Sequence, residues 1–359
     1  MRHEVVGALV LALLAACASD DPGASRGSED SPSSSSGTAA DHFLDTYVIA
    51  DGRVLRRDQG NDIVSEGQAY AMLVAELDDR DELVPTIWTW TKEHLGRDDG
   101  LLSFHASQDG TVVGADPAAD ADVLTAFALL TYDGPDGDSL HDDGLALARA
   151  VLEHEVLTDA DGRPVLAAGP WAVSTGIVNP SYLMPSEFEE LARITGDDTW
   201  SELADSSVAL VGQVTDDGRL LPPDWARLEG SRLVPVADAS GSAGAAQYGP
   251  DAQRVPLWFA HACTQDARDL AARWWSVLQQ DERSNAQALG TDGEVRDPNP
   301  QPVALLAAAA AAEAAGDTAG AQDLFRGAAE AAQGTPGYYG DAWLALVVGL
   351  PQWRGLACE

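Results

Sequence analysis

Twelve segments with helical spacing of apolar residues constrain the fold of this chain most strongly. From residue 41 onward, apolar side chains recur every three to four positions, and no long run alternates with a period of two. This pattern predicts twelve helices. They cover residues 41–50, 65–77, 81–95, 119–132, 142–157, 185–195, 198–213, 249–263, 266–280, 299–315, 318–332 and 339–350.

The connections between these helices differ in length in a regular way. Those leading into odd-numbered helices are mostly short, as at 78–80, 196–197, 264–265 and 316–317. Those leading into even-numbered helices are mostly long, as at 51–64, 96–118, 158–184, 214–248 and 281–298. Short links produce antiparallel helix hairpins, whereas long links in a compact domain are usually functional.

We therefore predict an all-α fold for residues 41–359, an (α/α)6 barrel of six helix hairpins. In such a barrel every long loop emerges on one face, at the N-termini of the even-numbered helices. An open α-solenoid is the alternative, although no repeat of fixed period is visible.

The first 40 residues are typical of an exported protein. An apolar run from Val5 to Ala16 is too short to span a bilayer and fits a signal-peptide core. It ends in Leu-Ala-Ala-Cys, which resembles a lipobox, so residues 1–17 are expected to be a lipoprotein signal peptide with Cys17 as the lipidated residue. Residues 18–40 are rich in Ser, Pro and Gly and are expected to form a disordered linker. The predicted location is extracytoplasmic, on the bacterial cell membrane, or secreted if Cys17 is not acylated.

The charge and the cysteines limit the partners. A formal net charge of −37 repels phosphate backbones, so we expect no nucleic-acid partner and no membrane contact beyond the lipid anchor. Most of this charge is expected to be a solvated acidic coat; a field that attracts a cationic glycan is the alternative. Cys263 and Cys358 either pair or stay free thiols. No metal-ligand spacing appears, and we expect a monomer without a cofactor or metal.

Three acidic motifs lie at the predicted starts of even-numbered helices. They contain Glu66 in SEGQ, Asp120 in ADAD and Asp251 in GPDAQRVP. Each has an ordinary explanation: Ser65 and Gln68 fit a capping box, Asp120 fits an N-cap, and Asp251 fits a first-turn acid after a proline. Taken singly, each motif is more typical of capping than of catalysis.

Their shared position changes this interpretation. The barrel places all three motifs on one face, together with the NPSY motif that contains Tyr182 and the GYYG motif that contains Tyr339. Trp171 lies in a long loop of the same face and is the predicted sugar platform. Carboxylates and aromatic rings in one groove are what a polysaccharide hydrolase requires, because an acid, a base and flat sugar-stacking surfaces act together.

The segments SEGQAYAM, DADVLTAFALL, NPSYLMP and GPDAQRVPLW resemble, in this order, the signatures of glycoside hydrolase family 8. The chain is most similar to bacterial endo-β-1,4-glucanases, including those associated with cellulose synthesis. The resemblance implies an (α/α)6 barrel and an inverting mechanism. It implies that Glu66 is the general acid and Asp251 the general base, and that Asp120 holds the distorted sugar.

The resemblance also implies supporting roles. Arg254 orients the base or a sugar hydroxyl, and Tyr182 and Tyr339 help to line the groove. Pro250 stands where the family usually has an aromatic residue.

The proposed acid also sets an expectation for its neighbours. A helix N-terminus favours the ionised form of a carboxyl group, whereas a general acid has to carry a proton. A second carboxylate nearby would favour the protonated form of Glu66, so we expect Asp120 to be a neighbour of Glu66. We also expect the Glu66 and Asp251 carboxyl groups to be about 6.5–9.5 Å apart.

The expected function is endo-acting hydrolysis of β-1,4 bonds in cellulose or a related β-glucan. Two alternatives remain open. In the first, the same fold and mechanism act on chitosan, xylan or mixed-linkage glucan. In the second, the chain is a glycan-binding surface lipoprotein without activity.

Overall fold

The structure is a computed structural model that describes residues 38–351 and residue 358. The predicted signal peptide with Cys17, and all but the last three residues of the predicted linker, lie outside the described residues. Those three residues belong to the folded part, because Thr38 forms a capping box with Asp41 at the start of the first helix.

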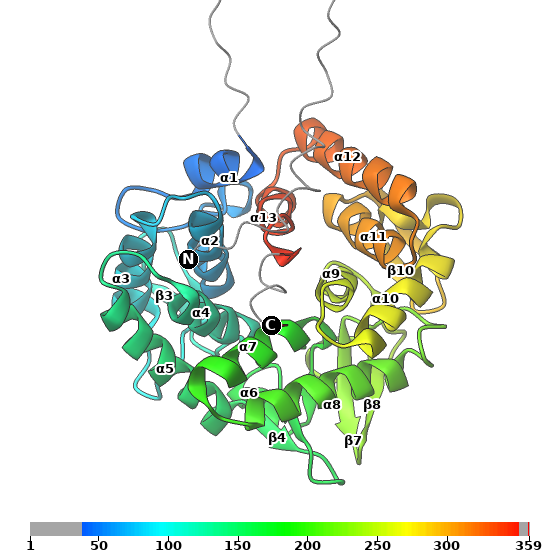
Figure 1. Cartoon of the computed structure of the whole chain (residues 1–359), viewed down its shortest axis with the longest axis horizontal. Helices are drawn as coiled ribbons and strands as arrows, with labels where there is room; N and C mark the ends of the chain where they lie inside the picture. The colour runs from blue at the N-terminus through cyan, green and yellow to red at the C-terminus, as the bar shows by residue number, and fades with distance from the viewer. Residues whose placement is uncertain (1–37, 352–357, 359) are drawn as a thin grey trace, which may run out of the picture. The chain divides into compact units, whose positions relative to one another are not determined.

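The described residues contain thirteen α-helices, twelve of which correspond to the predicted ones. An inner ring consists of α2 (Ser65–Leu77), α4 (Ala119–Thr131), α7 (Pro185–Thr195), α9 (Val255–Ala260), α11 (Pro302–Ala314) and α13 (Tyr338–Leu346). Outside it lie α1 (Ala39–Tyr47), α3 (Leu83–Leu95), α5 (Gly137–His154), α8 (Thr199–Val214), α10 (Gln265–Leu278) and α12 (Thr318–Gly334). Each inner helix contacts the next one, and α13 contacts α2, so the ring is closed (Figure 1).

Burial follows from the composition of the two rings. In α4, twelve of the 13 residues are buried, and its sequence is apolar on nearly every side apart from its first turn. A helix of this kind is stable only when other elements surround it. In contrast, α12 buries little more than an alanine stripe of Ala321, Ala328 and Ala332. The inner helices therefore form the core, and the predicted (α/α)6 barrel is confirmed.

The long connections contain short strands that the sequence analysis missed. They are β1 (Ile63–Val64), β2 (His105–Ala106), β3 (Val112–Gly114), β4 (Val156–Thr158), β5 (Pro164–Leu166), β6 (Ile177–Val178), β7 (Trp225–Glu229), β8 (Arg232–Val236), β9 (Gln247–Tyr248), β10 (Ala286–Gly290) and β11 (Val295–Pro300). All pairings are antiparallel, in sheets β1-β2-β3, β11-β10-β9, β4-β5 and β6-β7-β8. Strands of two to six residues are too short for a period of two to be recognised.

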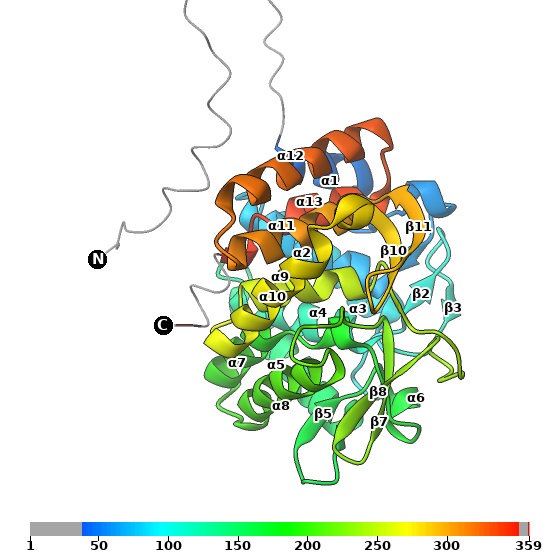
Figure 2. The same cartoon turned by 90° about the vertical axis from the view of Figure 1, so that its right-hand side faces the viewer.

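Figure 2 shows β2, β3, β7, β8, β10 and β11 gathered at one end of the ring of helices, together with the short helix α6 (Pro170–Val173). These strands belong to the long loops that lead into inner helices. The predicted collection of long loops on one face is therefore present in the structure.

Two predicted helix starts differ from the structure by more than four residues: α5 begins at Gly137 rather than at residue 142, and the start of α9 also differs. The helix expected at 249–263 is only Val255–Ala260, and it is preceded by a 3-10 turn, η4 (Ala252–Arg254). Pro250 is consequently not the first residue of an α-helix, and Pro256 takes the position near the helix start instead. Asp251 precedes the 3-10 turn and is not a first-turn acid of an α-helix.

The sequence left open whether two of the cysteines pair, and the structure shows that they do. Cys263, just before α10, and Cys358 form a disulfide with a Cα–Cα distance of 5.3 Å.

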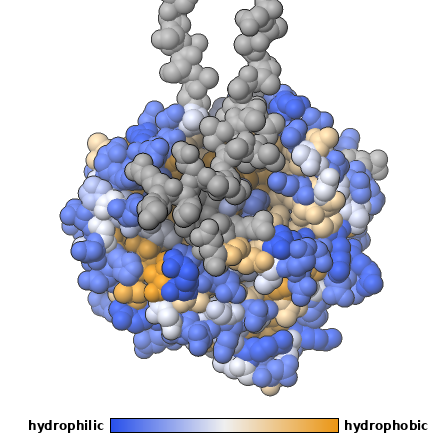
Figure 3. Space-filling model, in the orientation of Figure 1, coloured by the Kyte–Doolittle hydropathy of each residue, from blue (hydrophilic) through white to orange (hydrophobic). Residues whose placement is uncertain are grey.

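Within the described part of the chain, none of the helices combines the length and the apolar composition needed to cross a membrane. Hydrophilic residues cover most of the face seen in Figure 3, where the acidic excess of the chain can remain solvated.

Candidate active site

The acidic residues picked out by their helix positions meet at one buried arginine. The Arg254 Nη1 atom is 2.6 Å from Glu66 Oε1 and 2.8 Å from Asp120 Oδ2, and Arg254 Nη2 is 3.5 Å from Asp251 Oδ1. The Arg254 side chain is 3 % exposed. Because a guanidinium group carries five N–H donors in a fixed plane, it can hold three carboxylates in a defined arrangement.

None of the three acids caps its helix. The N-cap residues of α2 and α4 are Val64 and Ala118, neither of which caps with its side chain, so Asp120 is not an N-cap. The predicted capping box is also absent. The Ser65 hydroxyl is buried without a hydrogen-bond partner, and the Gln68 amide instead binds the preceding loop, accepting from Val54 N at 2.7 Å.

Glu66 has a second partner on its own helix. Tyr70 lies one turn further along α2, and its hydroxyl donates to Glu66 Oε1 at 2.5 Å while it accepts from Arg254 Nη1 at 3.2 Å. Burial raises the pKa of the Tyr70 hydroxyl well above its usual value, which keeps this group a donor. The sequence analysis did not assign Tyr70, although a spacing of four residues places two side chains on one helix face.

Asp120 is the most deeply buried of the three acids. Burial, followed by the nearby charge of Glu66, raises the pKa of Asp120 to about 7, against the opposing effect of Arg254. Since Glu66 and Asp120 both bind the same guanidinium nitrogen, the predicted proximity of the two carboxyl groups is confirmed. Near neutral pH, Asp120 can therefore retain a proton beside the arginine.

Asp251 is held from the opposite side. Asn179 Nδ2 donates to Asp251 Oδ2 at 2.9 Å, while Asn179 Oδ1 accepts from the Ser181 hydroxyl at 2.7 Å. The Ser181 hydroxyl in turn accepts from Arg254 Nη2 at 2.6 Å. The Asp251 side chain is 36 % exposed, against 18 % for Glu66 and 3 % for Asp120, so Asp251 is the most solvent-accessible of the three acids. The expected Glu66–Asp251 separation stays a prediction.

Two predicted groove residues contact this cluster. The Arg254 guanidinium carbon lies 5.4 Å from the centre of the Tyr182 ring, a cation–π contact. The Tyr339 hydroxyl donates to the Pro250 carbonyl at 3.0 Å, next to Asp251. Trp225 packs edge-on against Tyr182 with ring centres 6.4 Å apart.

Trp171, the predicted sugar platform, lies in α6 within the long loop before α7. Its side chain is 37 % exposed, and its Nε1 donates to the Pro117 carbonyl at 3.0 Å, close to the start of α4. The other tryptophans on helices are buried or half-buried. Trp171 is consequently fixed at its edge while part of its ring remains open to solvent.

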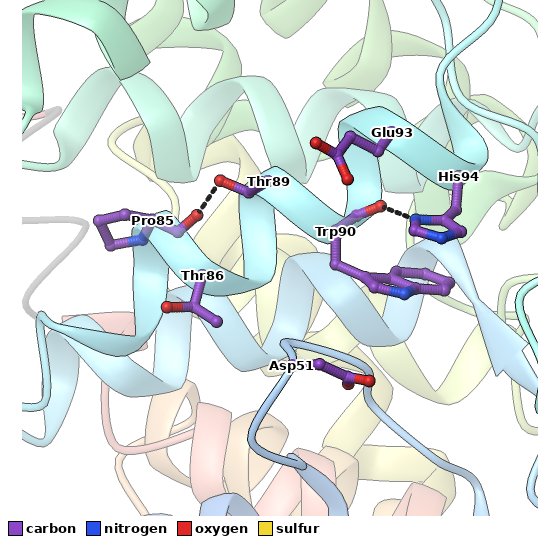
Figure 4. A pocket seen from close by; sticks show the side chains of 7 residues that line it. All are labelled: Asp51, Pro85, Thr86, Thr89, Trp90, Glu93 and His94. Carbon is purple, nitrogen blue, oxygen red and sulfur yellow. Dashed lines mark hydrogen bonds between the residues drawn. The ribbon is translucent and has the colours of Figure 1, made fainter.

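A separate hollow lies on the outer surface, along α3. Trp90, His94, Glu93 and Asp51 are among its lining residues, and the rings of Trp90 and His94 are stacked with centres 4.4 Å apart (Figure 4). It contains none of the predicted site residues. Among residues 38–351 and 358, no group of three or more His, Cys, Asp or Glu side chains is arranged to hold a metal ion.

Comparisons with known proteins concern the family and the fold of the chain. Residues 24–353 match the family model described as Glycosyl hydrolases family 8. An endoglucanase of Cellulomonas uda is 26% identical over 250 residues, which are 67% of this chain and 67% of that protein. The exo-oligoxylanase Rex8A of Paenibacillus barcinonensis, which releases xylose from the reducing end, is 26% identical over 212 residues, 53% of this chain and 54% of that protein.

Solved structures show the same fold. A β-1,3-1,4-glucanase from Paenibacillus sp. X4 superposes with a TM-score of 0.76 at 19% identity, covering 88% of this chain and 90% of that one. The endo-β-1,4-glucanase CMCax of Acetobacter xylinum gives a TM-score of 0.70 at 22% identity, covering 89% and 99%. At these identities the likeness concerns the fold.

The fold and the family match together define a glycoside hydrolase. Within that class, the chain belongs to glycosyl hydrolase family 8.

Proposed function

We propose that the protein is an endo-acting hydrolase of β-1,4-linked glucan that inverts the configuration of the cleaved bond. The observation that carries this proposal is the Arg254 cluster, in which the part-buried Glu66 and the buried Asp120 share one guanidinium group with a third, more exposed carboxylate, Asp251. An inverting glycosidase needs an acid at the leaving oxygen and a base that activates water on the opposite side of the sugar.

In the proposed reaction, Glu66 donates its proton to the glycosidic oxygen as the bond from that oxygen to the anomeric carbon breaks. Asp251 takes a proton from a water molecule, whose oxygen forms the new bond to the anomeric carbon. The products are a new reducing end and a free hydroxyl group on the leaving sugar. Asn179 and Arg254 hold the Asp251 carboxylate from two directions, which supports its role as the base.

Asp120 is proposed to hold the sugar at the cleavage point. Its second oxygen accepts from the Ala121 backbone N–H at 3.0 Å, so the carboxyl group is fixed at both ends. Tyr182 and Tyr339 are proposed to line the groove beside it, and Trp171 to stack on a sugar ring further along.

The test is release of reducing sugars from carboxymethylcellulose, chitosan and xylan by the wild type, Glu66→Gln and Asp251→Asn. We expect cleavage of carboxymethylcellulose and a loss of at least about a thousandfold in each variant. Proton NMR of the first product should show the α anomer. Full activity in either variant contradicts its role, and absence of cleavage by the wild type favours the glycan-binding alternative.

The named relatives favour a second group of substrates as the alternative. Rex8A releases xylose, and the Paenibacillus sp. X4 enzyme is a β-1,3-1,4-glucanase. If the protein cleaves xylan or mixed-linkage glucan faster than carboxymethylcellulose, the proposed substrate changes and the proposed mechanism stays the same. Chitosan cleaved fastest would support a role for the acidic surface.

We also propose that the protein acts outside the cytoplasm, attached through a lipid on Cys17. The disulfide supports an oxidising compartment. Fractionation of cells that express the wild type or Cys17→Ser tests this: the wild type should sediment with membranes and the variant should not. Equal distribution of the two contradicts the anchor.

A further inference from the structure

Asp224 is a buried carboxylate that the sequence analysis did not assign. It lies directly before β7, in the long connection between α8 and α9, and is 7 % exposed. Its Oδ1 accepts from the backbone N–H groups of Gly249, at 3.0 Å, and Ala252, at 2.8 Å. These two residues flank Pro250 and Asp251.

The other side of the Asp224 group is fixed as well. Oδ2 accepts from Gln247 Nε2 at 2.9 Å, and the Asp224 backbone N–H donates to the Gln247 carbonyl at 2.8 Å. Asp224 therefore binds residues 247, 249 and 252 of the same segment. A carboxylate with three N–H donors forms strong, charge-assisted hydrogen bonds.

The backbone comes unusually close to this carboxylate. A Cβ atom on Gly249 would be 2.4 Å from Asp224 Oδ2 and 2.9 Å from Gln247 Nε2, so a larger residue here has to displace one of them. Glycine at this position permits the contact. Burial, together with the neighbouring charge of Asp251, raises the pKa of Asp224 to about 6, in agreement with two carboxyl groups that lie near one another.

We propose that Asp224 is a positioning residue for the base: its hydrogen bonds to Gly249 and Ala252 hold the turn on which Asp251 stands, so that the Asp251 carboxylate faces the attacking water. This inference rests on the proposed role of Asp251. Tyr339 also binds the turn, at the Pro250 carbonyl, and Asn179 and Arg254 bind the Asp251 side chain, whereas Asp224 binds the backbone on both sides of Asp251.

The test compares kinetics of the wild type with those of Asp224→Ala, Asp224→Asn and Gly249→Ala on the polymer that the wild type cleaves. Asp224→Ala removes both anchoring bonds, and a displacement of about 1 Å can cost about a hundredfold in rate. We expect kcat to fall about a hundredfold with KM within about twofold of the wild type. Gly249→Ala, which forces the same contact apart, should lower kcat in the same way.

Asp224→Asn separates positioning from charge. The asparagine Oδ1 can still accept both backbone N–H groups, and the Gln247 amide can turn to present its oxygen to the asparagine nitrogen. We expect kcat within about threefold of the wild type. The matched control is Asp238→Ala in the same long connection, because Asp238 also accepts backbone N–H groups, from Ser240 and Ser242, on an exposed turn. It should leave kcat unchanged.

Hydrogen exchange of residues 247–254 measures the anchor without activity. Asp224→Ala should accelerate exchange in this segment, whereas Asp238→Ala should not. Wild-type kcat in Asp224→Ala, an equal loss in Asp224→Asn, or unchanged exchange would each overturn the proposal. If the wild type cleaves none of the polymers, the proposed function fails, and the exchange measurement still decides whether Asp224 holds the turn.

Discussion

Glu187 offers a quantitative test of how burial controls stability in this fold. It lies in the first turn of α7, is 3 % exposed, and has one carboxylate oxygen, Oε2, without a hydrogen-bond partner. Burial raises its pKa from 4.5 to about 7. The folded protein therefore binds the proton more tightly than the unfolded chain, and the protonated carboxyl group stabilises the fold.

The size of the effect follows from linkage. One pKa unit corresponds to about 1.4 kcal/mol, so the shift amounts to about 3 kcal/mol in the free energy of unfolding. This stabilisation is fully present below the unfolded pKa of 4.5 and is lost as the pH rises through about 7. Glu187→Gln resembles the protonated form at every pH. Compared with the wild type, it should gain about 2 to 3 kcal/mol of stability between pH 5 and pH 8.5.

The assay is urea unfolding of both proteins at pH 5 and pH 8.5 with the disulfide intact. Comparison of wild type and variant cancels the pH dependence that arises from the rest of the acidic chain. Glu202→Gln is the matched control, because Glu202 lies in the first turn of α8 but is exposed. If Glu187→Gln follows the wild type to within about 0.5 kcal/mol at both pH values, the reasoning from burial is refuted.

Three further predictions concern single features of the site and the fold. Arg254→Met should lower the free energy of unfolding at pH 7.5 by about 3 to 5 kcal/mol in urea titrations, because it leaves buried carboxylates without a counter-ion. The loss should be smaller at pH 5, where Asp120, with a pKa of about 7, takes up a proton, and a pH-independent loss contradicts this. Trp171→Ala should raise KM about 2- to 10-fold with kcat nearly unchanged in steady-state kinetics, as expected for a lost stacking surface; an unchanged KM argues against the platform. Reduction of Cys263–Cys358 should lower the free energy of unfolding by about 2 to 4 kcal/mol, measured with and without dithiothreitol, and Cys263→Ser should abolish the effect of the reductant.

The helices could be predicted because their signal is local. Apolar spacing and glycines such as Gly196, which closes α7 in a left-handed conformation, are visible within a few residues. The alternation of loop lengths then indicated the barrel. The predicted start of the α9 helix at residue 249 was wrong because Pro250 fits the first turn of a helix as well as it fits a turn. In the structure, Pro250 lies in a turn anchored by Asp224 and Tyr339. Those contacts come from distant parts of the chain and have no local signature.

The residues of the candidate site also divide into those with a local sequence signal and those without one. Glu66, Asp120 and Asp251 stood out by their positions relative to the helices, and the shared contact with Arg254 confirms that they meet. Asn179 lay within a recognised motif, but its contact with Asp251 joins residues 72 positions apart. Asp224 had no signal, because an aspartate beside two prolines is typical of an ordinary loop. Its role depends on a close backbone approach that only the folded structure reveals.

Closure of the inner ring has a consequence for how the protein matures. The helix that completes the ring, α13, is the last of the thirteen, and it places Tyr338 against Gly67 and Tyr339 against Pro250. A chain synthesised from its N-terminus contains Glu66 and Asp251 well before these tyrosines. The contacts of Tyr338 and Tyr339 therefore cannot form until the final helix has been made and packed, so a chain cut short before α13 lacks part of the residues around Glu66 and Asp251.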